Sequence, residues 1–252
     1  MAGTLNIPYD WAKSLFPGGI QYPSSTVISG RGGSGKPLVQ LAFVAEWIRN
    51  GGKALGIPLQ YPDASFLKNS IYKLYNLDLN QYRDQNRYIR FDPEMENMEK
   101  ATQDEYRANL LIPEVWDRVM AAAREDLSAS REDLLVYGSA LNLLLFAPRY
   151  QDEVVKKMEK MLEDTQNATY LFTVSNNVLG DKIARWEQAS DHLLFTRMNK
   201  NRQLFIYATR INGKAMESGE PQIPIQPETL DEIRAIAEKN RKTLIPKLKK
   251  LK

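Results

Sequence analysis

The sequence contains no cysteine, a single histidine and no long apolar run. Without cysteine the protein has no disulfides, no thiolate metal ligands and no cysteine nucleophile, and one histidine rules out a catalytic histidine cluster on a metal. No window reaches the roughly 18 apolar residues of a membrane span, and the first residues lack a basic segment followed by an apolar core. We therefore expect a cytoplasmic protein that does not associate with membranes.

An excess of charge of one sign is also missing. Lysine and arginine number 34 and aspartate and glutamate 31, which leaves a net charge of +3. This balance gives no argument for nucleic acid as a partner, although residues 239–252 are markedly basic. The basic tail contacts an acidic partner or nucleic acid, or it is a frayed and solvated end, and its shortness favours the frayed end.

Apolar periodicity predicts that strands and helices alternate along most of the chain. The expected strands are 25–29, 53–59, 88–91, 134–137 and 169–174. The expected helices are 38–50, 64–75, 114–125 and 152–163, with a weaker helix within 93–112. Because parallel strands need crossover connections, this alternation predicts an α/β fold with a mostly parallel central sheet flanked by helices.

The pattern changes after residue 191. Two strands at 192–198 and 203–211, joined by a polar turn, predict a C-terminal antiparallel hairpin. A proline-rich linker then precedes Thr229, which we expect to cap a helix reaching about Lys242, with Glu232 completing a capping box. We divide the chain into a domain at 1–220 and a linker with a helix at 221–252.

One segment carries a motif with a clear chemistry. Residues 30–36 fit the pattern G-x-x-x-x-G-K and lie between an expected strand and an expected helix. Glycines in such a loop let successive backbone N–H groups point inward, the helix N-terminus adds positive charge, and the lysine reaches the terminal phosphates of a nucleotide. The predicted ligand is ATP or ADP. The predicted binding residues are Gly30, Arg31, Gly32, Gly33, Ser34, Gly35, Lys36 and Pro37.

The last of these residues departs from the motif. A serine or threonine normally follows the lysine, and its hydroxyl binds magnesium, but this chain has Pro37. Proline is tolerated in the first turn of a helix, where its missing N–H would have no partner. The fold therefore survives the change, the magnesium site is in doubt, and we assign no metal ligands.

Several short segments, taken in order, resemble a known family. They are Pro17–Ile20 (PGGI), Val27–Gly30 (VISG), Leu38–Gly52, Leu134–Leu145 (LLVYGSALNLLL) and Thr209–Gly213. In this order, over residues 5–215, the chain resembles the KaiC-like group of RecA-superfamily ATPases. The resemblance implies a RecA-like P-loop NTPase fold, ATP as ligand, and assembly into a ring or filament. It also implies that Arg210 and Lys214 lie where relatives present basic residues to a neighbouring subunit's nucleotide, although an ordinary basic turn explains them as well.

The chain departs from this family at its catalytic positions. The family's magnesium-binding aspartate, at the end of a central strand, corresponds here to Gly138 or Tyr137. The family's pair of glutamates after the second strand corresponds to residues 60–63, where Asp63 is the nearest carboxylate. Asp63 is a weak candidate for a catalytic base, and a cap of the helix at 64–75 is the more economical interpretation.

These departures favour a pseudo-ATPase that binds nucleotide, hydrolyses it slowly or not at all, and acts as a regulatory or assembly factor. Two alternatives stay open. One is a working ATPase that uses Asp63 and Asp133 as substitutes, and the other is an interaction module with a vestigial pocket, which includes assembly on DNA. Whether the protein is an enzyme is therefore left undecided by the sequence.

Other polar residues have a functional and a structural interpretation. Ser175 and Asn176 end a predicted strand, where γ-phosphate sensors lie in related folds, but turn chemistry explains them equally well. Arg31 either contacts phosphate or is a solvated loop residue, and we favour the latter. His192 begins a strand and has no metal-ligand pattern around it, so a structural role is the better prediction.

Overall fold

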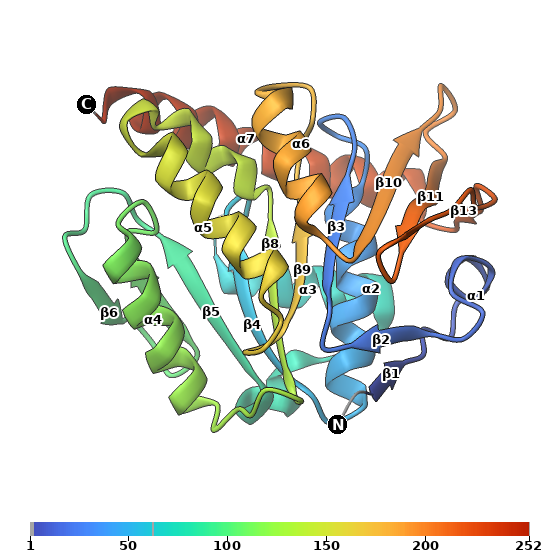
Figure 1. The fold of residues 1–252 in the computed structure, drawn as a ribbon, viewed down its shortest axis with the longest axis horizontal. Coiled ribbons are helices and arrows are strands. Elements are labelled where there is room, and N and C mark those ends of the chain that lie inside the picture. The colour runs from blue at the N-terminus through green and yellow to red at the C-terminus, as the bar shows by residue number, and fades with distance from the viewer. Residues whose placement is uncertain (1–2, 62, 252) are drawn as a thin grey trace.

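The computed structural model describes residues 3–61 and 63–251. They form an α/β structure with one large, mostly parallel sheet covered by helices on both faces (Figure 1). The strand order is β12-β11-β10-β3-β9-β8-β4-β5-β7-β6, with β13 paired to β11. The parallel strands are β10 (His192–Met198), β3 (Ser25–Ser29), β9 (Thr169–Thr173), β8 (Leu134–Ser139), β4 (Lys53–Pro58), β5 (Asn86–Phe91) and β7 (Glu105–Ala108).

Antiparallel strands lie at both edges of this sheet. They are β6 (Met98–Lys100) on one side and β11 (Leu204–Ile211), β12 (Lys214–Ala215) and β13 (Gln222–Ile223) on the other. A separate pair is formed by β1 (Gly3–Leu5) and β2 (Ile20–Tyr22). Because β3 and β9 have parallel neighbours on both sides, their residues are buried on both faces of the sheet.

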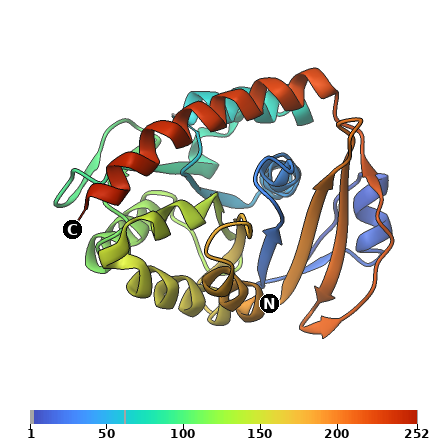
Figure 2. The same cartoon turned by 90° about the horizontal axis from the view of Figure 1, so that it is seen from above.

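Helices divide between the two faces of the sheet, as Figures 1 and 2 show. On one face lie α2 (Lys36–Arg49) and α3 (Ala64–Tyr75), and on the other α4 (Pro113–Asp126), α5 (Gln151–Glu163) and α6 (Gly180–Ala189). A hydrophobic cluster fills the space on each side. The remaining short elements are α1 (Asp10–Leu15), η1 (Leu79–Gln85), η2 (Leu141–Phe146) and η3 (Pro148–Tyr150).

The longest helix, α7 (Pro227–Lys250), crosses the edge of the sheet where the parallel strands end (Figures 1 and 2). It begins two residues before Thr229 and has no side-chain cap, so the predicted capping box is wrong. The prediction of a frayed tail is also wrong, because the helix continues through Pro246 and Leu248 is fully buried. Packing against the domain outweighs the cost of about 3 kcal/mol of a proline inside a helix.

Residues 93–112 form no helix, which corrects the expectation for this segment. They contain β6 and β7, and β7 extends the sheet by pairing in parallel with β5. The glutamates and methionines of this segment favour a helix locally, but pairing with β5 buries Tyr106 and Ala108. Tertiary contacts therefore override the local preference.

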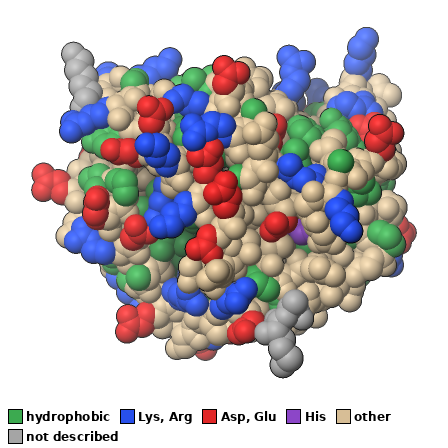
Figure 3. Space-filling model, viewed as in Figure 1, with side chains coloured by type: hydrophobic (Ala, Val, Ile, Leu, Met, Phe, Trp, Pro, Cys, Tyr) green, Lys and Arg blue, Asp and Glu red, His purple; other side chains and the backbone are tan. Residues whose placement is uncertain are grey.

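Charges of both signs are mixed on the face formed by α4, α5 and α6 (Figure 3). Ion pairs join these helices to one another, including Lys182–Asp152 at 2.7 Å and Arg185–Glu159 at 2.5 Å. Among the residues described, no helix is long and apolar enough to cross a bilayer.

Candidate phosphate-binding cleft

The glycine-rich loop joins β3 to α2 in a geometry that requires glycine. Gly30, at φ +140°, lies so close to β10 that a side chain there would come within 2.6 Å of the carbonyl oxygen of Thr196. Gly33 and Gly35 have φ of +78° and +75°, in the left-handed region that other residues rarely adopt. The Ser34 and Thr196 hydroxyls share a hydrogen bond of 2.8 Å, which fixes the loop to the sheet.

The loop offers backbone donors that the protein itself does not use. Gly32 N–H donates to Asn177 Oδ1 at 3.1 Å, and Ser34 N–H donates to the Arg31 carbonyl at 3.2 Å. Within residues 3–61 and 63–251, no acceptor pairs with the N–H groups of Gly33 and Gly35. Unpaired N–H groups at the start of a helix are the usual ligands of a bound anion.

Lys36 is the most unusual group of the loop, because it is a buried cation with uncharged partners. Its side chain is 4% exposed, and Nζ donates to the carbonyls of Gly30 (2.9 Å) and Arg31 (2.7 Å) and to Ser34 Oγ (3.3 Å). No carboxylate in the described chain forms an ion pair with it. Burial lowers the pKa of Lys36 to about 7, since water no longer stabilises the ammonium form.

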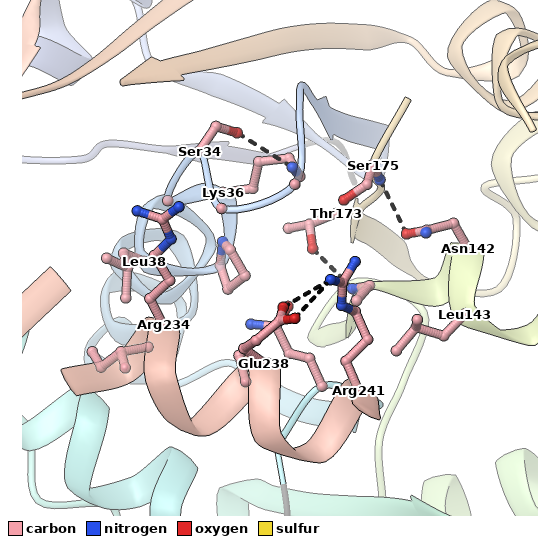
Figure 4. A pocket seen from close by; sticks show the side chains of 18 of the residues that line it. Ser34, Lys36, Leu38, Asn142, Leu143, Thr173, Ser175, Arg234, Glu238 and Arg241 are labelled. Atoms are coloured by element: carbon pink, nitrogen blue, oxygen red, sulfur yellow. Dashed lines mark hydrogen bonds and ion pairs between the residues drawn. The ribbon is translucent and has the colours of Figure 1, made fainter. Parts of the chain in front are cut away.

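The loop forms one wall of a cleft of about 440 Å³. Its other walls come from the ends of β8 and β9, from η2 and from α7 (Figure 4). Gly32, Gly33, Ser34, Gly35, Lys36 and Pro37 line it, whereas Gly30 and Arg31 do not. An apolar part of the lining is formed by Leu38, Leu143 and Phe146. The cleft therefore combines a cationic, donor-rich end with apolar walls.

The positions at which the sequence resemblance expects magnesium ligands are occupied by Pro37 and by Gly138 or Tyr137. Pro37 supplies a ring where a hydroxyl is needed, and its ring lines the cleft. At Gly138 a side chain would meet Leu141 Cδ1 at 2.8 Å, and the Gly138 carbonyl already accepts a hydrogen bond from Gln40 Nε2. Tyr137 is buried. In the part of the chain that is described, no three His, Asp or Glu side chains are grouped to hold a metal ion.

The carboxylates considered as substitutes lie elsewhere. Asp63 caps α3, with Oδ1 accepting the Phe66 N–H at 2.8 Å, and it does not line the cleft. Of its two interpretations, the helix cap is the one that the structure shows. Asp133 precedes β8, at the opposite end of the strand from the loop, where it pairs with Lys53 at 3.3 Å.

Ser175 lines the cleft and Asn176 does not. Ser175 N–H donates to Asn142 Oδ1 at 3.0 Å, while Asn176 N–H donates to the Gly30 carbonyl at 3.2 Å and thereby positions the loop. The neighbouring Asn177, absent from the sequence-based candidates, lines the cleft.

Two of the three remaining candidates, Arg210 and His192, have structural partners. Arg210 donates to the Glu187 carbonyl and to Ser190 Oγ, which ties β11 to the end of α6. His192 is fully buried, its Nδ1 accepts the Asn212 N–H at 3.2 Å, and burial lowers its pKa to about 4. Lys214 is exposed in β12. None of the three lines the cleft.

The sequence-based reasoning missed the contribution of α7. Arg234, Glu238 and Arg241 point from this helix into the cleft (Figure 4). They are spaced at i, i+4 and i+7, the spacing of one helix face, and this was the available signal. The spacing alone does not show which part of the protein this face of the helix contacts.

Comparison with known proteins identifies no relative: the chain matches no protein-family model and no curated protein sequence. The likeness to KaiC-like ATPases therefore stays a resemblance of sequence motifs.

Proposed function

We propose that this protein binds ATP or ADP through the loop at 30–37, hydrolyses it very slowly or not at all, and acts as a regulatory or assembly factor of KaiC-like type. The observation that carries the proposal is Lys36, a cation buried without a carboxylate partner. Burying an unpaired charge is costly, and an anion beside it removes that cost. A phosphate group is the anion that the surrounding N–H groups fit.

The size and the lining of the cleft support a nucleotide rather than phosphate alone. Its volume of about 440 Å³ lies in the range of sites for small organic ligands. The apolar side chains of Leu38, Leu143 and Phe146 provide a surface for a base or sugar, away from the charged loop.

Slow turnover follows from the groups around the loop. Hydrolysis in P-loop ATPases depends on a metal ion that neutralises phosphate charge and on a group that orients the attacking water. Pro37 and Gly138 supply no metal ligand, and Asp63 is occupied as a helix cap. Among the described residues, the one carboxylate that lines the cleft is Glu238, which accepts a hydrogen bond from Arg241, so the residues present suit binding better than hydrolysis.

Thermal unfolding with ATP, with ADP and without nucleotide, each in magnesium or in EDTA, tests the proposal. At about 100 times Kd, binding stabilises the folded state by roughly 2.7 kcal/mol, or about 5–11 °C for a chain of this size. Lys36→Ala should lose this shift, and the control Lys13→Ala, on the exposed face of α1, should keep it.

Phosphate release measured on the same samples separates the alternatives. We expect no turnover above that of the Lys36→Ala variant. Magnesium-dependent turnover that disappears in this variant would establish a working ATPase instead. The absence of any nucleotide shift in the wild-type protein would leave an interaction module with a vestigial pocket.

A further inference from the structure

The phosphate loop faces a set of charged side chains on α7. Among the described residues that line the cleft, the charged ones are Lys36 on the loop side and Arg234, Glu238 and Arg241 on α7. Three of the four are basic, so the cleft has a net positive charge before any ligand enters. Two of the three basic side chains, Arg234 and Arg241, come from α7, where Glu238 offsets one of them.

Arg234 lies directly against the loop. A Cβ atom built on Gly33 would be 2.9 Å from Arg234 Nε and 3.2 Å from its Cζ and Nη2, so the guanidinium covers the backbone of this glycine. No carboxylate or carbonyl of the described chain accepts a hydrogen bond from it. The guanidinium therefore lies against Gly33, whose N–H is unpaired, and its own donors are available.

Arg241 has a partner inside the cleft. Its Nη2 donates to Glu238 at 2.9 Å, and this hydrogen bond is the main cause that lowers the pKa of Glu238, with the charge of Arg234 contributing. Figure 4 shows the pair on α7, on the side of the cleft opposite the loop residues Ser34 and Lys36. A phosphate group entering this space offers Arg241 a second, more highly charged partner.

Contacts along its length hold α7 in this position. Leu230 and Ile233 pack in the cluster around α2, and Leu248 packs in the cluster on the other face of the sheet. Asn240 Nδ2 donates to the Leu59 carbonyl at 3.1 Å, and Lys73 pairs with Glu232 at 2.9 Å. The arginines are thus presented to the loop by an anchored helix.

We propose that α7 is the second wall of the phosphate site, and that Arg234 and Arg241 supply the positive charge that a magnesium ion supplies in P-loop ATPases. The cleft is then selective for the metal-free form of a nucleoside di- or triphosphate. This inference rests on the proposed function, because it assigns the charges that surround the same ligand. It also accounts for the presence of a phosphate-loop motif in a chain that has no metal ligands at the positions expected beside it.

Calorimetric titration with ATP, ADP and AMP in EDTA, repeated in magnesium, tests the inference. Arg234→Ala should weaken ATP and ADP binding in EDTA by about tenfold to a hundredfold, the effect of losing hydrogen bonds between charged groups. AMP should be affected less, because the loop and its lysine hold the terminal phosphates. The matched control is Lys239→Ala, which removes the same charge from an exposed position of α7 outside the cleft.

Glu238→Gln distinguishes a competing carboxylate from a metal ligand. If Glu238 only neutralises Arg241 in the empty cleft, the variant should bind ATP in EDTA about threefold to tenfold more tightly, because a like charge near the phosphates is removed. Weaker binding of magnesium ATP by this variant would show that Glu238 serves a metal, and would overturn the inference.

Two other results would also overturn it while leaving the proposed function intact. One is wild-type binding that requires magnesium, and the other is an Arg234→Ala variant that binds as tightly as Lys239→Ala. Failure of the wild-type protein to bind any of the three nucleotides would refute the proposed function itself.

Discussion

Replacing Lys36 with methionine should stabilise the protein when no ligand is present. Methionine has a similar length and carries no charge, so its burial does not require removing a charged group from water. A pKa displaced from 10.5 to about 7 corresponds to roughly 5 kcal/mol at 1.36 kcal/mol per pH unit. The variant loses three hydrogen bonds to Gly30, Arg31 and Ser34, worth about 1 kcal/mol each. The net expectation is a gain of about 2 kcal/mol at pH 7.

The pH dependence of this gain identifies its cause. Between about pH 7 and 10.5 the unfolded chain keeps the proton of Lys36 and the folded chain releases it, so wild-type stability rises with pH through this window. The variant lacks this contribution. The difference between the two proteins should therefore be largest at pH 7 and below and shrink by up to about 1.4 kcal/mol per pH unit above it, changing sign near pH 8.5.

Urea unfolding of both proteins at pH 6, 7, 8 and 9 measures the difference directly, because the titration of all other groups cancels. Thermal unfolding at pH 7 should show a rise of about 4–8 °C for the variant. A variant that is less stable than wild type at pH 7, by an amount that does not change with pH, would refute the account of Lys36 as a desolvated cation.

Three other perturbations test separate parts of the structure. Nucleotide affinity should fall by up to about tenfold per pH unit above pH 7, because a bound phosphate favours protonated Lys36; titration calorimetry between pH 7 and 9 measures this, and an affinity that does not change with pH would contradict it. Gly138→Asp should cost about 1–3 kcal/mol in urea unfolding through its clash with Leu141, and it should not produce magnesium-dependent phosphate release while residue 37 is proline; a gain of turnover would show that Pro37 does not prevent hydrolysis. Leu248→Ala should cost about 2–4 kcal/mol and Lys249→Ala less than about 0.5 kcal/mol, and equal effects would show that the end of α7 does not pack.

The sequence predicted those parts of the fold whose local preferences agree with their surroundings. The strand at 25–29 and the helix at 64–75 are found with these bounds. A run of β-branched residues favours the strand, and an amphipathic period of 3.6 residues favours the helix, so the local pattern and the tertiary structure agree. The segment 93–112 was mispredicted because pairing with β5 decides its structure, and no local pattern reports that pairing. The RecA-type assignment of the fold is still a prediction.

The candidate site was predicted on its loop side only. The glycine and lysine pattern gives the residues of the loop because the motif is contiguous in sequence. Arg234 and Arg241 lie some 200 residues away in the chain, and they join the site only because α7 crosses the end of the sheet. Tertiary placement of this kind leaves no mark in a single sequence beyond the spacing along the helix.

The contact between Gly138 and Leu141 limits how the protein can change. A carboxylate at position 138 requires Leu141 to shift or to be made smaller, and it has no hydroxyl beside it while residue 37 is proline. An aspartate at position 138 alone loses packing against Leu141, and a hydroxyl at position 37 alone has no carboxylate beside it. Neither substitution made by itself is therefore expected to produce metal-dependent hydrolysis. We therefore expect that a metal-dependent site in this cleft needs substitutions at positions 37 and 138 together, a combination that libraries of single variants do not contain.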